Sequence, residues 1–196
     1  MVDLDSISVS AGESFFRLCP RSTSQEGMKR NSKVRRAGRG GDLFEVRKSS
    51  IQGRGVFAKR RIRPGQRIVE YTGEKVTNDE ADRRYDEEKM ERHHTFLFTL
   101  DDDHCIDGDV PTNKAKLINH SCDPNCEVII EDERIWIHAL KNIQPGVELA
   151  YDYQYERTGP NIAELEKFYV CRCGSPKCRG SIMAPPKKRK KKKKKR

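Results

Sequence analysis

The sequence predicts a mainly β fold with short helices. From residue 43 the chain consists of short runs rich in β-branched and aromatic residues, and glycine and proline separate these runs. Two later segments have the pattern of β-hairpins, and only one charged segment has the pattern of a helix. The strands are therefore expected to be short and twisted.

The first three runs are LFEVRKS, GVFAKR and RIVEYTGEKV, which begin at residues 43, 55 and 67. The turn-forming residues Gly53, Gly55, Pro64 and Gly65 lie between or beside them. Thr77 followed by Glu80 has the spacing of a capping box. It predicts that an exposed helix begins there, within the charged segment 77–94.

The remaining strands are predicted from two hairpins and one alternating segment. TFLFTLDDDHCIDG (95–108) indicates a strand, an acidic turn and a return strand, and CEVIIEDERIWIHAL (126–140) is expected to turn near residues 131–133. In GVELAYDYQY (146–155) a strand would place all the large residues on one buried face: Val147, Leu149, Tyr151, Tyr153 and Tyr155. An aromatic core face is one interpretation, but buried tyrosine hydroxyls need partners, which favours a polar pocket.

Charge divides the chain into a domain between two basic arms. The net charge is +10, and the last ten residues, KKRKKKKKKR, are all basic. We expect residues 1–42 to be a basic, flexible arm and residues 184–196 to be a disordered tail. Such a tail suits nucleic-acid binding through counterion release, a nuclear address, or solubility alone.

Composition also excludes some classes. No apolar run approaches the length of a membrane span, and the first residues lack a secretory signal, so a soluble, intracellular protein without a membrane partner is expected. Seven cysteines are an odd number, which argues against a fully disulfide-paired secreted framework. No pattern typical of a hydrolase is present.

Three cysteines lie close together in CRCGSPKC, at Cys171, Cys173 and Cys178. Three thiolates at this spacing suit a structural zinc site, which usually needs a fourth ligand. Cys122 and Cys126 are the candidates for that ligand, and unliganded thiols are the alternative. A zinc site would bring the two segments together in space.

Two further motifs are weak when taken alone. NHSCDPNC (119–126) is rich in turn formers and predicts a loop, so Asn119 and His120 could be ordinary turn residues. SIQGRGVFA (50–58) places two glycines around Arg54, which would let a ligand approach the main chain. An ordinary turn explains the same pattern.

The order of the motifs is more specific than any one of them. GRGVFA, YTG at 71–73, NHSCDPNC, ELAYDY at 148–153 and CRCGSPKC together resemble the SET-domain protein lysine methyltransferases with a post-SET cysteine cluster. The resemblance covers about residues 43–181. It implies a SET fold of small twisted sheets with a knot-like crossing, in which the C-terminal strand passes under the Asn-His loop. The SET domain would span residues 43–158 and a post-SET zinc segment residues 159–183.

The resemblance also implies the ligands and their residues. S-adenosylmethionine would be the methyl donor, and a structural Zn²⁺ would be held by Cys122, Cys171, Cys173 and Cys178. The expected cofactor-binding residues are Gly53, Arg54, Gly55, Val56, Phe57, Tyr85, Asn119 and His120.

The substrate channel would be formed by Phe96, Tyr151 and Tyr153, with Tyr153 and Tyr151 as the catalytic residues. An apolar channel disfavours the lysine ammonium by desolvation, so the free amine needed for attack becomes accessible. The family has Phe or Tyr at the position of Tyr151. A hydroxyl there crowds a methylated amine, which predicts mainly mono- or dimethylation.

The sequence departs from the family at several positions. The family often has Tyr where this chain has Phe96, so one hydroxyl that would orient the lysine is missing. TNKAKLINH (112–120) replaces the common G-N-x-A-R-F-I-N-H, with Thr112, Lys116 and Leu117 at the changed positions. Lys116 keeps the charge of an arginine but lacks its planar fork.

The expected substrate is a basic protein. The acidic turns at 101–103 and 131–133 suit a basic peptide such as a histone tail, although they could be solvated turn residues, and a non-histone basic protein is an open alternative. The basic arms would bind nucleic acid. In a eukaryote the location would be the nucleus or chromatin; in a bacterium it would be the cytoplasm, the nucleoid or, for a secreted effector, a host cell.

Two other functions compete with the enzyme hypothesis. One is a catalytically weak SET module that binds a peptide or chromatin, which the Phe96 substitution motivates. The other is a zinc-stapled nucleic-acid-binding protein that depends on its arms. The sequence carries no signal for oligomeric state.

Overall fold

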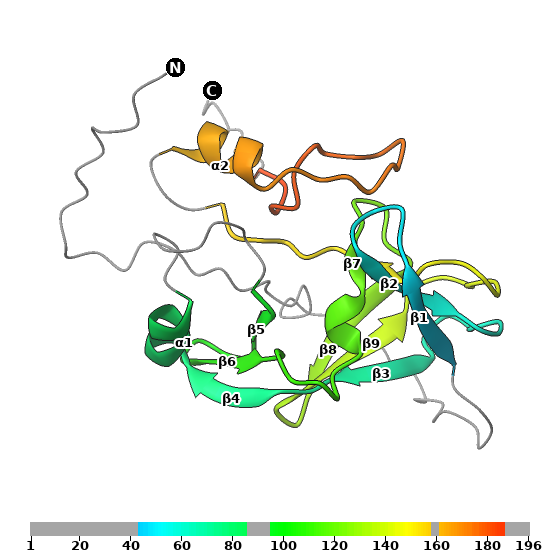
Figure 1. The fold of residues 1–196 in the computed structure, drawn as a ribbon, viewed down its shortest axis with the longest axis horizontal. Helices are drawn as coiled ribbons and strands as arrows, with labels where there is room; N and C mark the ends of the chain where they lie inside the picture. Colours follow the sequence, from blue (N-terminus) through cyan, green and yellow to red (C-terminus); the bar gives the residue numbers. More distant parts are fainter. Residues whose placement is uncertain (1–42, 86–94, 158–160, 187–196) are drawn as a thin grey trace, which may run out of the picture.

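Ten short strands and two short α-helices make up the described parts of the computed structural model, residues 43–85, 95–157 and 161–186 (Figure 1). The mainly β prediction is therefore confirmed. The elements in chain order are β1 (Phe44–Lys48), β2 (Arg54–Ala58), β3 (Arg67–Tyr71), β4 (Glu74–Thr77), α1 (Asn78–Arg84), β5 (Leu97–Thr99), β6 (His104–Asp107), a 3₁₀ helix (Ala115–Leu117), β7 (Asn119–His120), β8 (Cys126–Glu131), β9 (Arg134–Ala139), β10 (Ala150–Tyr151) and α2 (Ile162–Phe168).

The strands form four small sheets. β1 pairs with β2, β9 lies between β3 and β8, and β6 lies between β4 and β5, all antiparallel. β10 and β7 pair in parallel, with Ala150 opposite Asn119 and Tyr151 opposite His120. Since β7 and β10 come from distant parts of the chain, this pair brings the NHSCDPNC and ELAYDY motifs together.

Two local predictions are confirmed. The Thr77 hydroxyl accepts a hydrogen bond from the Glu80 N–H at 3.2 Å, so Thr77 caps α1 as the capping-box spacing indicates. The β8–β9 hairpin turns at Asp132 and Glu133, whose φ angles are 50° and 56°. Two consecutive positive φ angles are typical of the tight turn that matches strand twist. The predicted helical residues 86–94, the arm 1–42 and the tail from residue 187 lie outside the described residues.

RIVEYTGEKV is not one strand but two, β3 and β4. The break lies at Thr72 and Gly73, because the chain leaves β9 there and pairs with β6 instead. A Cβ atom at Gly73 would lie 2.1 Å from the Asp107 carbonyl oxygen. A glycine is therefore needed where β4 begins.

GVELAYDYQY is also not the single alternating strand that its pattern predicts. Only Ala150 and Tyr151 are strand residues, Val147 is 42% exposed, and Ala150 is buried. The segment changes partner along its length: Glu148 pairs with Phe57, Tyr151 with His120, and Tyr155 with Met183. Because no single strand runs beside the whole segment, buried and exposed side chains do not alternate along all of it.

NHSCDPNC is only partly a loop, because Asn119 and His120 form β7 and Cys126 begins β8. The loop between them is bonded to the segment around β10. The Ser121 N–H donates to the Tyr151 carbonyl at 3.0 Å, and the Asn125 side chain both donates to the Glu148 carbonyl at 2.7 Å and accepts from the Ala150 N–H at 2.9 Å. These contacts agree with the crossing of loop and C-terminal strand that the resemblance implies.

Two clusters of buried apolar residues support these sheets. The larger includes Val56, Ile62, Ile135, Ile137 and Leu149, all at most 1% exposed, and it joins the sheets of β2 and β9 to the strand of β10. A smaller cluster lies under α1. Burial of such side chains is the main stabilising contribution to the fold.

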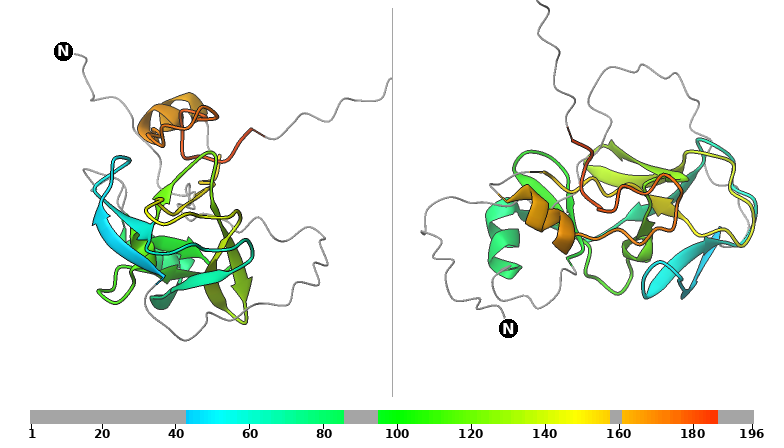
Figure 2. Two further views of the ribbon diagram at one scale, coloured as in Figure 1. Left: turned by 90° about the vertical axis from the view of Figure 1, so that its right-hand side faces the viewer. Right: turned by 90° about the horizontal axis from the view of Figure 1, so that it is seen from above.

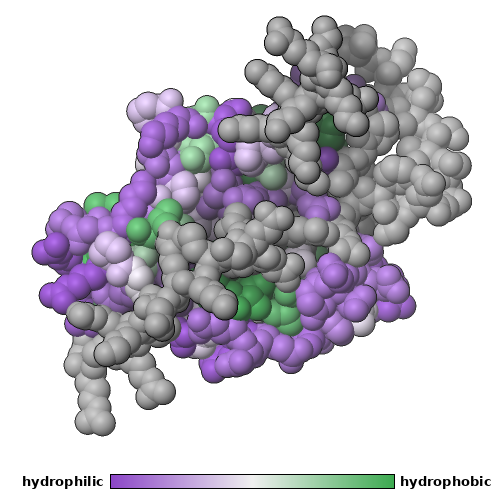
Figure 3. Space-filling view, turned by 180° about the vertical axis from the view of Figure 1, so that it is seen from behind, coloured by the Kyte–Doolittle hydropathy of each residue, from purple (hydrophilic) through white to green (hydrophobic). Residues whose placement is uncertain are grey.

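α2 and the segment that follows it form a layer over one side of the strands (Figures 1 and 2). Seen from behind, the described surface is largely hydrophilic, with hydrophobic residues gathered in small areas (Figure 3). Neither described helix has the length and apolar composition of a membrane span.

Candidate functional site

A pocket of about 200 Å³ lies where six separate segments of the chain meet. It brings together six of the residues that the sequence singled out, namely Gly53, Arg54, Phe96, Asn119, Tyr151 and Tyr153. Polar groups of the 50–58 segment and Asn119 lie on its wall together with aromatic rings. The pocket therefore combines a polar part with an aromatic part.

Tyr153 is fixed at the aromatic part by its hydroxyl, which donates to the Ile118 carbonyl at 2.8 Å. Its ring lies 4.8 Å from the ring of Tyr151 and 6.0 Å from that of Tyr155. Burial raises the pKa of Tyr153 well above its ordinary value, so the hydroxyl stays protonated at neutral pH. A protonated hydroxyl held in this way keeps the ring in one orientation.

Asn119 connects the 50–58 segment to the segment before β10. Its side-chain amide nitrogen lies 2.7 Å from Glu148 Oε1 and 3.1 Å from Ser49 Oγ. The same nitrogen lies 3.3 Å and 3.2 Å from the carbonyl oxygens of Gln52 and Arg54. The Asn119 side chain thus ties both motifs to one wall of the pocket.

His120, an expected cofactor-binding residue, does not line the pocket but connects Tyr153 to the cysteine cluster. Its Nδ1 accepts a hydrogen bond from the Tyr153 N–H at 3.1 Å, and its Nε2 lies 3.3 Å from Cys122 Sγ. Burial lowers the pKa of His120 to about 4, so the ring is neutral at neutral pH. Because Nδ1 is an acceptor, Nε2 carries the proton and donates to the sulfur.

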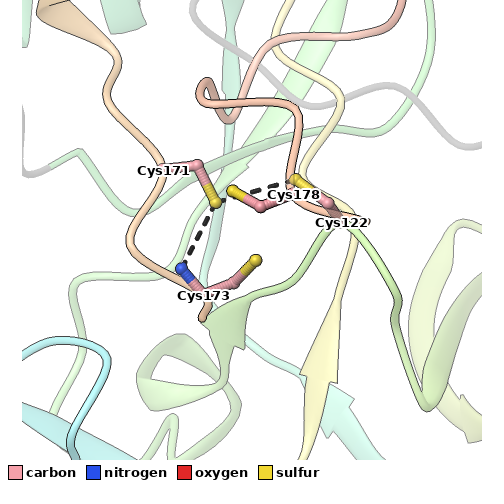
Figure 4. Close-up of side chains that lie close together, drawn as sticks. All are labelled: Cys122, Cys171, Cys173 and Cys178. Carbon is pink, nitrogen blue, oxygen red and sulfur yellow. Dashed lines mark hydrogen bonds between the residues drawn. The ribbon is translucent and has the colours of Figure 1, made fainter. Parts of the chain in front are cut away.

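Cys122, Cys171, Cys173 and Cys178 converge on one point, with all four sulfur atoms within 4.8 Å of one another (Figure 4). Zn–S bonds of about 2.3 Å in a tetrahedron place the sulfurs about 3.8 Å apart. Cys122 Sγ and Cys171 Sγ are 3.7 Å apart. The residues present therefore fit a tetrahedral zinc ion.

Backbone N–H groups also point at these sulfurs, as thiolates require. The Arg179 N–H donates to Cys122 Sγ at 3.3 Å, and the Gly180 N–H donates to Cys178 Sγ at 3.4 Å. Burial opposes ionisation of Cys173, but hydrogen bonds from backbone N–H groups and neighbouring thiols outweigh it and lower its pKa to about 6. Burial raises the pKa of Cys122 and Cys171, so ionisation of all four thiols this close together would need a cation.

The sequence left Cys122 and Cys126 as alternatives for the fourth ligand, and the structure distinguishes them. Cys126 begins β8 in the core, where it is 1% exposed and donates to the Asn125 side-chain oxygen at 3.3 Å. Burial raises the pKa of Cys126 to about 12. Cys122 is the cysteine that joins the cluster.

Some expected cofactor residues do not line this pocket. Val56 is fully buried in the core, Phe57 lies under the Arg47 guanidinium, and Gly55 packs against Glu148. Tyr85 ends α1, and its hydroxyl donates to Asp107 Oδ1 at 2.9 Å. These four residues are not part of the pocket wall, so their expected contact with a cofactor stays a prediction.

Sequence reasoning also missed part of the wall. Tyr71, Tyr155 and Ile182 line the pocket but were not singled out as site residues. Tyr71 belongs to the YTG motif and Tyr155 to the alternating segment, so both carried a usable signal. Ile182 carried none, because it reaches the pocket only through the folding of the cysteine segment.

Comparison with known proteins agrees with these motifs. The family model of the SET domain matches residues 53–154, just over half of the chain. The chain is 36% identical over 136 residues to the histone-lysine N-methyltransferase trr of Drosophila melanogaster, an alignment that covers 67% of this chain and 5% of that protein. It is 39% identical over 141 residues to the histone H3-lysine(4) N-trimethyltransferase ATX1 of Arabidopsis thaliana, covering 69% of this chain and 13% of that protein.

A third relative is the histone-lysine N-methyltransferase, H3 lysine-4 specific, of Mycosarcoma maydis. It is 38% identical over 137 residues, which cover 67% of this chain and 9% of that protein. The chain thus spans only a small part of the length of these curated relatives. The matched region contains most of the pocket wall, from Gly53 to Tyr153, and on this evidence the chain belongs to the SET-domain family.

Proposed function

We propose that this chain transfers methyl groups from S-adenosylmethionine to the side-chain amine of lysine in a histone. The observation that carries the proposal is the pocket in which Asn119 and the Gly53–Arg54 turn share one wall with Tyr151 and Tyr153. Such a site offers a polar surface for a charged cofactor and an aromatic surface for an alkyl amine. The relatives named as histone-lysine methyltransferases support it.

S-adenosylmethionine, when bound, supplies an electrophilic methyl group on its sulfonium. The residues that would hold it are Gly53, Arg54 and Asn119, which lie at the polar part of the pocket. Gly53 has a φ of +48°, which suits glycine, and a Cβ atom there would meet nothing within 4 Å. The turn is thus open towards a ligand.

The aromatic part of the pocket would prepare the lysine. Free lysine has a pKa of about 10.4, and the nucleophile must be the neutral amine. Rings from Phe96, Tyr151 and Tyr153 replace water around the amine, which lowers its pKa by desolvation. The amine then loses its proton to solvent before attack.

Tyr153 would act as the catalytic tyrosine through its position, since its hydroxyl donates to the Ile118 carbonyl and stays protonated. Its oxygen retains lone pairs that can accept a hydrogen bond from the amine. Fixing the amine in line with the methyl group lowers the entropic part of the barrier. Tyr153 would then be in direct contact with the reacting atoms.

The degree of methylation is proposed to be one or two methyl groups. Tyr151 lines the pocket and its ring contacts those of Phe98 and Tyr153, so its hydroxyl would occupy space that a larger methylated amine would need. Phe96 supplies no hydroxyl, and the Lys116 ammonium lies 4.9 Å from the centre of its ring. Product size is then limited mainly by Tyr151.

Zinc is proposed as a structural ion held by the four clustered cysteines, because their sulfur spacing fits it. Its role would be to fix the segment that contributes Ile182 to the pocket. The Arg179 guanidinium donates two hydrogen bonds, each 2.8 Å long, to the Asp152 carboxylate, which fastens the same segment to the strand of Tyr151. The metal and this ion pair would therefore both hold the segment that contains Ile182 in place.

The substrate is proposed to be histone H3, with its lysine 4 as the first position to test, because two relatives carry that residue in their names. The acidic turns give less support than their sequence suggests. Asp101 accepts the Asp103 and His104 N–H groups of its own turn, and Glu131 pairs with Arg67 at 2.6 Å. A histone substrate would place the protein at chromatin, where the basic arms would meet nucleic acid.

The test is transfer of labelled methyl from S-adenosylmethionine to recombinant core histones, run beside binding of the cofactor by calorimetry. Transfer to lysine supports the proposal. Binding of the cofactor without transfer to any histone would favour the non-catalytic module instead. Failure to bind the cofactor would contradict the enzyme hypothesis itself.

A further inference from the structure

Glu148 lies behind the pocket wall and has no role in the function proposed above. Its carboxylate is part-buried: Oε1 lies 2.7 Å from the amide nitrogen of Asn119, and the Ser49 hydroxyl lies 2.8 Å and 3.0 Å from its two oxygens. Glu148 does not line the pocket, whereas Asn119 does. Any effect of Glu148 on a bound ligand therefore passes through Asn119.

The surroundings of Asn119 determine which way its amide faces. Around the nitrogen lie the Glu148 carboxylate, the Ser49 hydroxyl and the carbonyls of Gln52 and Arg54. Carbonyl and carboxylate oxygens only accept hydrogen bonds, so this end of the amide must be the NH₂ group. Among the described residues none donates a hydrogen bond to the opposite end, Asn119 Oδ1, which leaves that oxygen for a ligand.

The fold makes room for this carboxylate. A Cβ atom on Gly55 would lie 2.2 Å from Glu148 Oε1 and 3.0 Å from the Ser49 Cβ. A side chain at position 55 would therefore displace the Glu148 carboxylate from this place, and glycine leaves room for it. Gly55, the second glycine of the GRG motif, thus lies beside the Glu148 carboxylate and not in the pocket wall.

We infer that Glu148 is the positioning residue that holds Asn119 with its oxygen towards the cofactor. The inference rests on the proposed function, in which Asn119 binds the cofactor, and it concerns only the residue that orients the Asn119 amide. The Glu148 carboxylate strengthens this arrangement because it accepts a charge-assisted hydrogen bond from the Asn119 amide.

The experiment measures cofactor affinity and the steady-state constants of four variants: Glu148→Ala, Glu148→Gln, Ser49→Ala and Asn119→Ala. Loss of one charge-assisted hydrogen bond predicts that Glu148→Ala raises the KM for S-adenosylmethionine about tenfold or more, with kcat changed less than about threefold. Glu148→Gln keeps the shape of the side chain and one acceptor oxygen. Its KM for S-adenosylmethionine is expected to lie between those of wild type and Glu148→Ala. Ser49→Ala removes the hydroxyl that donates to the carboxylate and also accepts from the Asn119 amide, and it is expected to raise KM by a few fold.

A double-mutant comparison separates positioning from general structural damage. In the Asn119→Ala background, Glu148→Ala is expected to raise KM no further, because the group that it positions is already gone. Zinc content and thermal midpoint of every variant are measured in parallel. The two gentler variants, Glu148→Gln and Ser49→Ala, keep the inference testable where Glu148→Ala fails to fold.

The outcomes distinguish this inference from the proposed function. Additive effects of Glu148→Ala and Asn119→Ala, or Glu148 variants that bind the cofactor like wild type, would overturn the positioning role while leaving the enzyme proposal intact. A wild-type protein that binds no S-adenosylmethionine would overturn both.

Discussion

Replacing Cys122 with alanine tests the cysteine cluster against a control from the same eight-residue motif. Cys122 lies with Cys171, Cys173 and Cys178, whereas Cys126, four residues later, is buried in the core. Cys122→Ala removes one of four proposed zinc ligands, and Cys126→Ala removes a thiol that no metal would use. Both variants lose one sulfur atom, so the difference between them reports the contribution of that sulfur to zinc binding.

The size of the effect follows from the geometry. The 3.7 Å between Cys122 Sγ and Cys171 Sγ matches about 3.8 Å for a zinc tetrahedron, so each sulfur would form a full bond. Zinc binding to structural sites in peptides is worth about 10–16 kcal/mol, roughly a quarter of it per ligand. At about 1.4 kcal/mol per tenfold, one lost ligand lowers zinc affinity about 10² to 10³-fold.

The assay is competition for zinc with a chromophoric chelator of known affinity, together with metal content by mass spectrometry. The expected result is one zinc per chain for wild type and Cys126→Ala, and a zinc affinity lower by about 10² to 10³-fold for Cys122→Ala. Wild-type zinc affinity in Cys122→Ala, or loss of zinc in Cys126→Ala, would refute the assignment.

Four further outcomes are expected. Tyr153→Phe lowers kcat about 10²-fold or more while zinc content stays at the wild-type level, because the hydroxyl that would contact the amine is lost; a kcat near wild type in stopped-time assays contradicts this. The ratio of wild-type to Tyr153→Phe rates stays constant from about pH 7 to 9, because the raised pKa keeps the hydroxyl protonated, and a ratio that changes with pH argues against it. Tyr151→Phe shifts products towards higher methylation by mass spectrometry, and unchanged products count against Tyr151 as the size limit. Removal of residues 187–196 leaves turnover on a short peptide unchanged, whereas lost turnover favours a function that depends on the tail.

Structural features that depend on residues close together in the chain were predictable from the sequence. The points at which a segment changes its pairing partner were not. The Thr77 cap and the turn at Asp132 and Glu133 depend on residues close together in the chain, and both appear as expected. The segment 146–155 shows a clean alternation, but it pairs in turn with three unrelated segments, so its alternation does not describe one strand. Periodicity cannot show how many neighbours a segment has.

The candidate site shows the same division. Asn119, Tyr151 and Tyr153 were found through motifs, and the structure gathers them at one pocket. The choice of Cys122 over Cys126 depends on where each lies in the fold, because Cys126 begins β8 in the core and Cys122 lies in the preceding loop beside the other cysteines, which spacing alone does not give. Glu148 stands in the ELAYDY motif, yet its contact with Asn119 spans 29 positions of the chain and appears only in three dimensions.

Methyl transfer to lysine is tested most directly by mass spectrometry of core histones and basic ribosomal proteins after incubation with labelled S-adenosylmethionine, comparing wild type with Tyr153→Phe. The expected result is label on histone lysine, mainly as one or two methyl groups, that falls sharply in Tyr153→Phe. Label on other residue types, or equal labelling by both proteins, would contradict the role of this pocket in lysine methylation.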